Sequence, residues 1–404
     1  MAGKALNTLQ ETEPGWTVAG EQPKEPSTGD YRFFFWKGRV ALYAILKALG
    51  IGPGDYVLVP GYTCVVVPGA ICFLGAKPLY ADIDPSTYNI SLNQIEAALR
   101  PDGPRIKAVI VQHTYGLPTD TAPIVKWARQ RGIAVVEDCC HSLGSRYLGE
   151  AGDWQDVGSL GDAAFFSSQW SKPVTTGLGG WAVTGSPALA DKVRLIHANE
   201  CISPSWAESM VLAAQVAGRS LVSSPSSFWL AQTTYRFLGR AGLAIGSSAE
   251  AELRGEMPPE YAKRMSSFQL RLLSRKLASF AGGIPHRRRL RTVYDRALAS
   301  AGLCALEVPQ PVDPVLLRYP VRVRNKREVL DAARCSRIEL GDWFDHPLHP
   351  KESDARAFGY GEGMCPNAEE AASQVINLPV HDRVSEEAAQ KMVAFLKDVA
   401  RPVE

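Results

Sequence analysis

Short apolar runs and longer amphipathic stretches alternate along the first half of this 404-residue chain. Runs rich in Val, Ile and Leu predict strands at residues 56–59, 77–82, 108–111 and 133–136. Stretches in which apolar residues recur every three or four positions predict helices at 38–49, 63–74, 91–99 and 122–131. Strands that alternate with helices in this way predict an α/β fold, with a mostly parallel sheet and helices on both of its faces.

The second half of the chain has a different pattern. Beyond a strand at 180–184 and a helix at 187–197, the apolar helical segments 206–222 and 228–245 are separated by a Ser-Ser-Pro-Ser-Ser run. Neither segment is an uncharged apolar run of about 20 residues, so no membrane span is expected. The last predicted elements are helices at 259–277 and 287–301, strands at 319–325 and 376–380, and an amphipathic helix at 385–399.

These changes of pattern divide the chain into parts. Residues 1–30 are polar and rich in Pro, Gly and Glu, which is typical of an N-terminal arm. Residues 31–280 are predicted to form a large domain with an enlarged insertion at 201–257, and residues 281–404 a smaller C-terminal α/β domain. Because 404 residues are many for one hydrophobic core, two domains are expected on length alone.

Composition excludes some classes of function. A formal net charge of +2 gives no reason to expect a nucleic-acid partner or a membrane surface. The eight cysteines show no zinc-type CxxC spacing, so no metal site is expected. Without a secretory signal they are expected to be reduced thiols of a cytoplasmic protein.

Lys172 lies in an unusual setting for a lysine. It follows the strand-like run 163–166 and precedes the glycine-rich run 175–180, so its neighbours are small and hydroxylic. Most lysines are solvated surface charges, but a lysine in such a pocket would have a lowered pKa and stay nucleophilic near neutrality. Such an amine can form a Schiff base with pyridoxal 5′-phosphate, which makes this the predicted cofactor.

A carboxylate is also needed beside the pyridine nitrogen of that cofactor, and Asp138 is the candidate. It stands at the carboxyl end of a predicted strand, where ligands of parallel sheets bind. On sequence alone, an N-cap for the following segment is the more common role for such a residue. The adjacent Glu137 should point to the opposite face of the strand. His113, which also follows a strand, is expected to face the same crevice as Asp138.

The other parts of a cofactor site have weaker signals. Backbone amides at the start of the first helix, around Gly38 and Arg39, could bind the phosphate, with a hydroxyl from Ser167. The side chains predicted to pack on the cofactor ring are His141, Tyr62 and Cys64. Each of these residues could instead be an ordinary turn or core residue.

Several motifs occur in the order typical of one family. They lie at 49–60, 74–78, 81–85, 113–120, 137–141, 264–270, 359–360, 365–369 and 377–381. Together they resemble the DegT/DnrJ/EryC1/StrS family of sugar aminotransferases that depend on pyridoxal phosphate, over about residues 36–397.

The resemblance implies a fold-type I enzyme that is a homodimer with shared active sites. It makes Lys172 the Schiff-base lysine and Asp138 the partner of the pyridine nitrogen, with His141 near the ring. It places Ser167, Gly38 and Arg39 at the phosphate. Residues of the second subunit, such as Asn199 or Arg264, could complete the phosphate site. The activity it implies is amino transfer from glutamate or glutamine to a keto-sugar, with a nucleotide-linked sugar favoured.

Three departures from the family pattern affect the acceptor side. Cys64 stands where the family usually has an aromatic residue, Leu178 replaces the glutamate of a Gly-Glu-Gly-Gly motif, and Trp343 replaces a histidine. Tyr115, Trp343 and His113 are the predicted substrate contacts. The departures leave two alternatives open. One is a non-sugar ketone or aminocyclitol substrate, or another reaction of the same cofactor. The other is a regulatory protein without catalysis.

Overall fold

The structure of this chain is a computed structural model that describes residues 31–100, 103–149, 152–221, 245–309 and 311–403. The predicted N-terminal arm at 1–30 lies outside these residues. So does nearly all of the predicted helix at 228–245.

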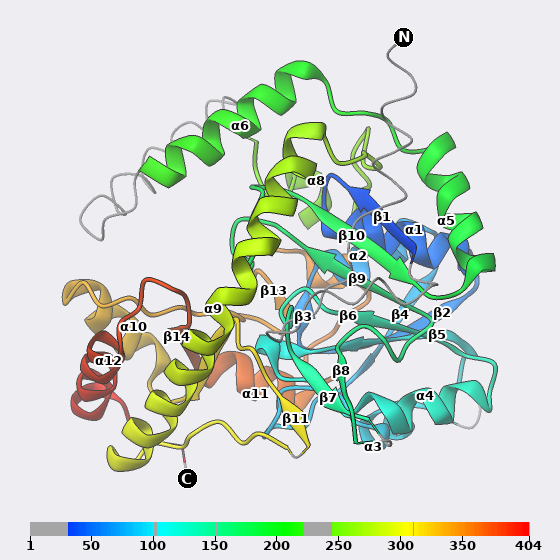
Figure 1. Cartoon of the computed structure of the whole chain (residues 1–404). Coiled ribbons are helices and arrows are strands. Elements are labelled where there is room, and N and C mark those ends of the chain that lie inside the picture. The colour runs from blue at the N-terminus through cyan, green and yellow to red at the C-terminus, as the bar shows by residue number, and fades with distance from the viewer. Residues whose placement is uncertain (1–30, 101–102, 150–151, 222–244, 310, 404) are drawn as a thin grey trace.

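A seven-stranded sheet forms the centre of the molecule (Figure 1). Its strand order is β1 (Tyr31–Phe35), β10 (Gly180–Thr184), β9 (Ala163–Ser167), β6 (Ala134–Asp138), β5 (Ile106–Gln112), β2 (Tyr56–Pro60) and β4 (Lys77–Ala81). The last five strands run parallel to one another, whereas β10 and β1 are antiparallel to their neighbours. The predicted α/β fold with a mostly parallel sheet is therefore confirmed.

Helices cover this sheet. They are α1 (Gly38–Ala48), α2 (Val66–Cys72), α3 (Leu92–Ala98), α4 (Thr121–Arg129) and α5 (Pro187–Asn199). Helix α1 packs against β9, β10, α2 and α5, which is why nearly all of its residues are buried. The amphipathic pattern predicted most of these helices to within a few residues.

Two local predictions were wrong. The strand β1 was not predicted. It pairs antiparallel with β10 and forms one edge of the main sheet. The helix expected at 63–74 begins only at Val66, because Thr63 and Cys64 form the short strand β3, which pairs with β13 (Leu348–His349). That pairing could not be read from sequence, since its partner lies almost 300 residues away.

Two helices were expected between 259 and 301, but the structure has one, α9 (Ser267–Ser300). It begins at the N-cap Ser266, whose hydroxyl accepts a hydrogen bond from the Gln269 amide, and it continues through Pro285. The pattern was misread because Gly and Pro usually end a helix. Here the burial of Phe280 and Ile284 against neighbouring core residues overrides that local preference.

The C-terminal part has its own small sheet and core. Strand β12 (Arg318–Arg322) pairs antiparallel with β14 (Val375–Pro379), and α9 packs on α12 (Glu386–Val399) beside them. The remaining elements are β7 (Arg146–Leu148), β8 (Trp154–Asp156), β11 (Val312–Asp313), α6 (Trp206–Leu221), α8 (Glu250–Leu253), α10 (Lys326–Cys335), α11 (Pro366–Gln374), and the 3-10 helices η1 (Thr114–Gly116) and η2 (Ala355–Phe358).

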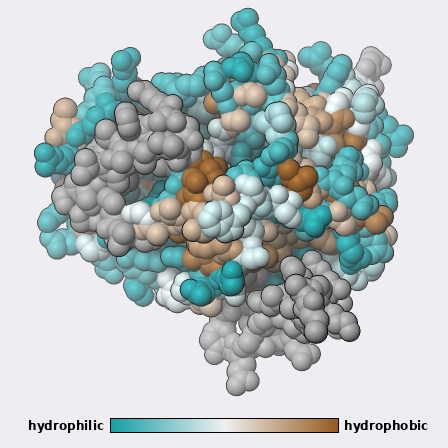
Figure 2. All heavy atoms as spheres, turned by 90° about the horizontal axis from the view of Figure 1, so that it is seen from above, coloured by the Kyte–Doolittle hydropathy of each residue, from teal (hydrophilic) through white to brown (hydrophobic). Residues whose placement is uncertain are grey.

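Helix α6 extends from the body of the molecule (Figure 1). On the face seen in Figure 2, hydrophobic residues gather toward the middle and hydrophilic residues surround them. Of the helices in the described part of the chain, none combines the length and the apolar character that crossing a bilayer requires.

Candidate active site

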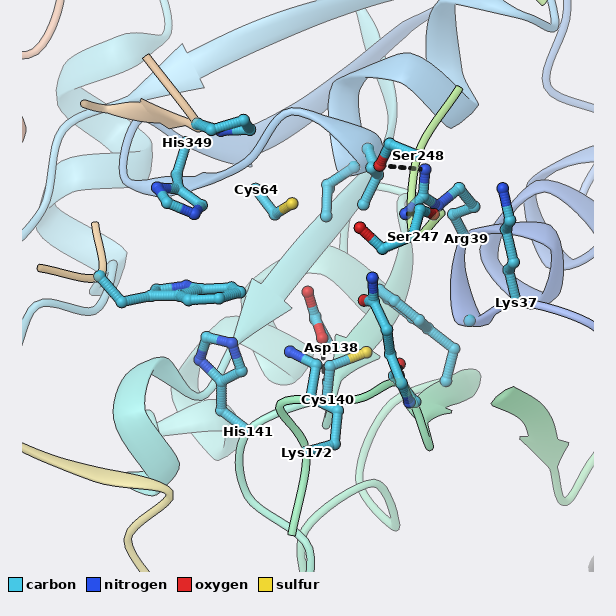
Figure 3. Close-up of a pocket in the computed structure, with 18 of the residues that line it drawn as sticks. Lys37, Arg39, Cys64, Asp138, Cys140, His141, Lys172, Ser247, Ser248 and His349 are labelled. Atoms are coloured by element: carbon cyan, nitrogen blue, oxygen red, sulfur yellow. Dashed lines mark hydrogen bonds between the residues drawn. The ribbon is translucent and has the colours of Figure 1, made fainter. Parts of the chain in front are cut away.

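A cavity of about 320 Å³ lies beyond the carboxyl end of β6. This is the edge of a parallel sheet at which ligands usually bind. Figure 3 shows Lys172, Asp138 and Cys140 on one side of it, and Arg39, Lys37, Ser247 and Ser248 on another. The structure thus brings together residues from four separate parts of the chain. The volume of the cavity is in the range of small-molecule sites.

Lys172 reaches the cavity from the loop between β9 and β10. This loop is closely packed: the Ser168 hydroxyl is 2.8 Å from that of Thr176, and a Cβ on Gly179 would lie 2.2 Å from Ser168 Oγ. Burial lowers the pKa of the Lys172 amine, while the nearby Cys140 and Asp138 act in the opposite direction. The loop therefore holds an amine that loses its proton more readily than the amine of a free lysine.

Asp138 also lines the cavity. Its Oδ1 accepts a hydrogen bond of 2.9 Å from the Cys140 amide, in a turn that is not followed by a helix. The alternative role as a helix N-cap is therefore wrong. Burial raises the pKa of Asp138, and the Cys140 hydrogen bond and the charge of Lys172 partly offset this.

The first turn of α1, with Gly38 and Arg39, forms another wall of the cavity. A Cβ on Gly38 would lie 3.0 Å from both the Phe166 carbonyl oxygen and Ser167 Cβ, so glycine is required for this close packing. The result is that Ser167 stands beside the first amides of helix α1. Such amides are donors without intrahelical partners, and they are suited to a phosphate group.

The Arg39 side chain makes a contact that sequence did not predict. Its guanidinium donates to Ser248 Oγ at 2.9 Å and to the Ser247 carbonyl at 3.1 Å, and it forms a short ion pair with Glu252. The end of the insertion 201–257 therefore closes this side of the cavity.

Lys37 is the second cation at this end. Its Nζ lies 3.3 Å from Glu252, and burial followed by the charge of Arg39 lowers its pKa to about 8. Lys37, Ser247 and Ser248 line the cavity but were missed from sequence. The adjacency of Lys37 to the predicted helix start was an available signal for the lysine. The two serines had no signal in the sequence.

His141 and Cys64, the candidates for packing on the cofactor ring, both line the cavity. His141 Nδ1 accepts a hydrogen bond of 3.3 Å from the Tyr115 amide, and burial lowers the pKa of the imidazole well below its usual value. His141 is therefore neutral, and Nε2 carries its proton.

Tyr62 and Tyr115 do not line the cavity. Both are fully buried, and their hydroxyls are 2.8 Å apart. The Tyr115 hydroxyl also donates to the Trp343 carbonyl at 2.7 Å. Sequence could not show this, because their partners come from distant segments. These tyrosines lie behind the site and support the residues that face it.

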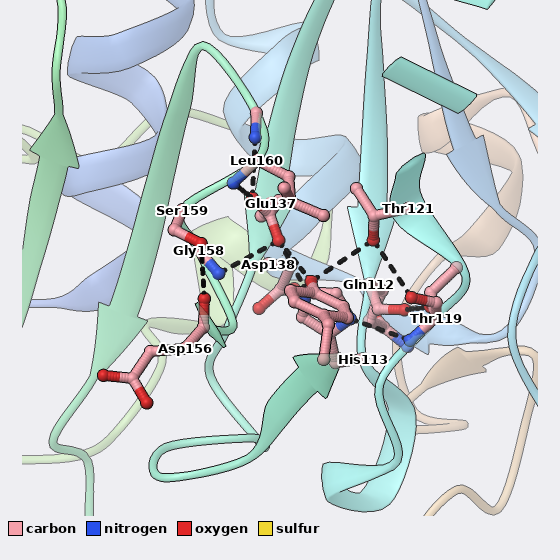
Figure 4. Close-up of polar contacts among 12 residues, drawn as sticks. Gln112, His113, Thr119, Thr121, Glu137, Asp138, Asp156, Gly158, Ser159 and Leu160 are labelled. Carbon is pink, nitrogen blue, oxygen red and sulfur yellow. Dashed lines mark hydrogen bonds and ion pairs between the residues drawn. The ribbon is translucent and has the colours of Figure 1, made fainter. Parts of the chain in front are cut away.

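The expectation that His113 faces the crevice is wrong. Its Nε2 lies 3.1 Å from Glu137, and Glu137 also accepts hydrogen bonds from the Tyr147 hydroxyl and from the amides of residues 158, 160 and 161 (Figure 4). Cys139 lies near this pair, but both Glu137 oxygens already have donors. Glu137 lies on the face opposite to Asp138, as strand alternation predicts.

The C-terminal part contributes Trp343 and His349. Pairing of β13 with β3 places His349 beside Cys64, and its Nδ1 lies 2.6 Å from Asp345. The centres of the Trp343 and His349 rings are 4.5 Å apart, and Lys172 Nζ is 5.6 Å from the centre of the Trp343 ring. His349 was not predicted as a site residue.

Comparison with known proteins agrees with this geometry. The model of the DegT/DnrJ/EryC1/StrS aminotransferase family matches residues 35–218 and 231–397. The chain belongs to this family. It is therefore an aminotransferase, and the resemblance seen in its motifs is confirmed.

Relatives with assigned names include a UDP-N-acetyl-3-dehydro-alpha-D-glucosamine 3-aminotransferase of Acidithiobacillus ferrooxidans. It is 28% identical over 361 residues, which cover 89% of this chain and 82% of that protein. A "pleiotropic regulatory protein" of Geobacillus stearothermophilus is also 28% identical, over 90% of this chain and 83% of its own. A GDP-perosamine synthase of Caulobacter vibrioides is 40% identical over 160 residues, 40% of this chain and 41% of that one.

Solved structures show the same fold. A family aminotransferase from Brucella abortus matches with a TM-score of 0.69 and 22% identity, over 92% of this chain and 86% of its own. DesV of S. venezuelae, solved with a ketimine intermediate, matches with a TM-score of 0.69 and 24% identity, over 92% of this chain and 85% of that chain.

Proposed function

We propose that this aminotransferase binds pyridoxal 5′-phosphate through Lys172 and transfers an amino group from glutamate or glutamine to a nucleotide-linked keto-sugar. The observation that carries the proposal is the arrangement of one cavity. It has a partly buried amine on one wall, a buried carboxylate beside it, and a helix start with a hydroxyl on another.

The residues present are suited to this cofactor. The amides of Gly38 and Arg39 with Ser167 would hold the phosphate, and the two cations against the single charge of Glu252 leave this end net positive. Asp138 would pair with the pyridine nitrogen. His141 and Cys64 are the cavity residues available to pack on the ring.

Bound cofactor would supply the electron sink that the reaction needs. The work of the chain is then to move protons and exclude water. Lys172 would act as the base that takes a proton from the α-carbon of the donor. Its lowered pKa keeps a population of neutral amine for this step. The Asp138 carboxylate would keep the ring nitrogen protonated, which is the state that draws electrons.

A nucleotide-linked acceptor is supported by the names of several relatives, which act on UDP-, GDP- or dTDP-linked sugars. The cavity wall at Leu178 and Trp343 differs from the family motifs, and this keeps a non-sugar ketone or aminocyclitol as the second candidate.

We also propose that the protein is a homodimer and that it is cytoplasmic. The dimer is supported by exposed apolar side chains on one face of α6, where Trp206 is 79% and Met210 50% exposed. Sedimentation velocity tests it, and a single species of monomer mass at micromolar concentration would contradict it.

The experiment that tests the function follows ¹⁵N from labelled glutamate into a panel of nucleotide keto-sugars and ketocyclitols. Wild type should aminate at least one nucleotide keto-sugar. Lys172→Ala should lose the transfer completely, and Lys276→Ala, a change at an exposed lysine of α9, should keep it. Transfer by Lys172→Ala at the wild-type rate would refute the assignment. Amination of ketocyclitols alone would favour the second candidate.

A further inference from the structure

His349 presents an unpaired ring nitrogen at the cavity. Its side chain lines the cavity and is 15% exposed. Nδ1 of this ring lies 2.6 Å from Oδ1 of Asp345, whereas no described residue forms a hydrogen bond with Nε2. Figure 3 shows the ring near Cys64, on the side of the cavity away from Lys37. The residues assigned to the cofactor leave this nitrogen without a role.

Asp345 fixes the tautomer of the His349 ring. Burial acts to raise the pKa of the Asp345 carboxyl, but the contact with His349 outweighs it, and the pKa lies below its usual value. Asp345 is therefore an anion that accepts the proton of His349 Nδ1. The Lys351 amide donates to the same oxygen at 3.2 Å and holds the carboxylate in place. In the neutral ring, Nε2 then carries a lone pair and no proton.

The backbone and the neighbouring rings hold His349 in this position. The pairing of β13 with β3 is extended by the Val65 amide, which donates to the His349 carbonyl at 2.8 Å. The centres of the Trp343 and Phe344 rings lie 4.5 and 5.6 Å from that of His349. The lone pair is thus set in place before a ligand binds, which lowers the cost of binding.

The chemistry of this nitrogen shows which ligand group it suits. A lone pair accepts a hydrogen bond from O–H or N–H, and it repels an anion. The phosphate of the cofactor and the carboxylates of an amino donor are therefore poor matches. The one amine of the donor must reach the position of Lys172. A hydroxyl group is the match that remains, and keto-sugars and ketocyclitols carry several.

The position of His349 is also suited to the acceptor. Lys172 Nζ and the His349 ring lie 5.6 and 4.5 Å from the centre of the same Trp343 ring, so they are no farther apart than these two distances together. A six-membered ring places its hydroxyl groups a few ångström from its carbonyl carbon, and a hydrogen bond adds about 2.8 Å. A ring hydroxyl can therefore reach Nε2 while the carbonyl carbon is beside Lys172.

We propose that His349, oriented by Asp345, accepts a hydrogen bond from a ring hydroxyl of the acceptor. The inference rests on the proposed function and narrows its substrate class to polyhydroxylated ketones. His349 is then a specificity residue that distinguishes such an acceptor from a simple ketone.

The test follows ¹⁵N transfer to UDP-, GDP- and dTDP-linked keto-hexoses and to pentahydroxycyclohexanone, each beside derivatives that lack one ring hydroxyl. His349→Phe keeps a ring and removes the lone pair. It should raise the half-saturating concentration of the accepted ketone about fivefold to fiftyfold, with little change in the rate at saturation. His349→Gln, whose amide oxygen can replace the lone pair, should recover part of this loss. With the derivative that lacks the bound hydroxyl, wild type and His349→Phe should behave alike.

Two further variants separate recognition from a structural effect. Asp345→Ala keeps the ring but frees its tautomer, so it should cost less than His349→Phe. His346→Phe changes a histidine of the same loop that does not line the cavity, and it should match wild type. If His349→Phe does not fold, His349→Gln and Asp345→Ala decide.

Three results would overturn this role. One is a half-saturating concentration for His349→Phe within twofold of wild type. Another is an equal loss with the parent ketone and with every derivative that lacks a hydroxyl. The third is a loss confined to the half-reaction with L-glutamate or to cofactor affinity, which would assign Nε2 to the donor or to the cofactor. Absence of transfer by wild type itself would instead refute the proposed function, so the two failures are distinguishable.

Discussion

Glu137 and Asp138 are adjacent carboxylates with different surroundings. Asp138 faces the cavity and has one described hydrogen bond, from the Cys140 amide. Glu137 is fully buried on the other side and is held by three backbone amides, Tyr147 and His113. One residue is placed for chemistry, and the other fixes the end of the strand that carries it.

This contrast predicts opposite effects of two conservative changes. Asp138→Asn should reduce the rate of the glutamate half-reaction at least about a hundredfold, because the ring nitrogen loses its anionic partner, while stability changes little. Glu137→Gln should lower the free energy of unfolding by about 2–4 kcal/mol, because an amide cannot accept all of these bonds. Urea unfolding and stopped-flow absorbance measure the two effects. Equal losses of rate in both variants would contradict the division of roles.

The lowered pKa of Lys37 gives a prediction for pH. Its pKa is about 8 in the folded protein and 10.5 for the free side chain, so the unfolded state binds more protons between these values. The free energy of unfolding should therefore rise with pH from 8 to 10.5 in wild type, by up to about 3 kcal/mol relative to Lys37→Met. Urea unfolding of cofactor-free protein at several pH values measures this. Parallel pH profiles for the two proteins would show that Lys37 is not buried as described.

At this scale the sequence predicted the residues whose chemistry is tied to a strand end or a helix start. Lys172, Asp138, His141 and Gly38 all line the cavity. His113 was misplaced because the residue after a strand can turn to either side. Ser247 and Ser248 could not be found, since they reach the cavity only through the tertiary contact with Arg39.

Among the elements, α6 supports the loop that carries Lys172. Leu212 of this helix is fully buried in a cluster with Trp36 and Leu178. A Cβ on Gly177, whose φ is +85°, would lie 2.8 Å from Leu212 Cδ1. The segment 201–257 therefore contacts both the lysine loop, through α6, and the start of α1, through the contacts of Ser247 and Ser248 with Arg39.

A double-mutant cycle tests this support. Leu212→Ala should lower the free energy of unfolding by about 2–4 kcal/mol and weaken cofactor binding, because a cavity opens beneath the loop. Gly177→Ala should also destabilise, through its positive φ and through the clash with Leu212. In the Leu212→Ala background the second cost should shrink in part, because the contact with Leu212 is gone while the close approach to Val216 Cγ2 at 2.9 Å remains. Strictly additive effects, measured by urea unfolding, would mean that loop and helix do not couple.

The main strands and helices could be predicted because their apolar periodicity is local. The strands β3 and β13 could not, because each is two residues long and exists only through the other. Helix α9 was divided in the prediction because local Gly and Pro signals were given more weight than the burial that holds it together.

At the scale of the whole molecule, two sheets contribute residues to the cavity. One is the seven-stranded sheet, and the other is the two-stranded sheet of β3 and β13. The large sheet supplies Asp138 and the lysine loop, and the pairing of β3 with β13 brings Trp343 and His349 from the C-terminal part. The division into two domains at 280/281 stays a prediction, and its boundary lies within helix α9. The way in which they share the site depends on contacts between distant segments, so only the family resemblance implied it.

The most direct test is the absorbance spectrum of the purified protein before and after addition of excess L-glutamate. A band near the edge of the visible range that shifts on addition of glutamate is expected, and Lys172→Ala should lack both the band and the shift. A band that neither glutamate nor glutamine changes would contradict amino transfer while leaving the cofactor in place. No band, even after addition of pyridoxal 5′-phosphate, would contradict the cofactor site itself.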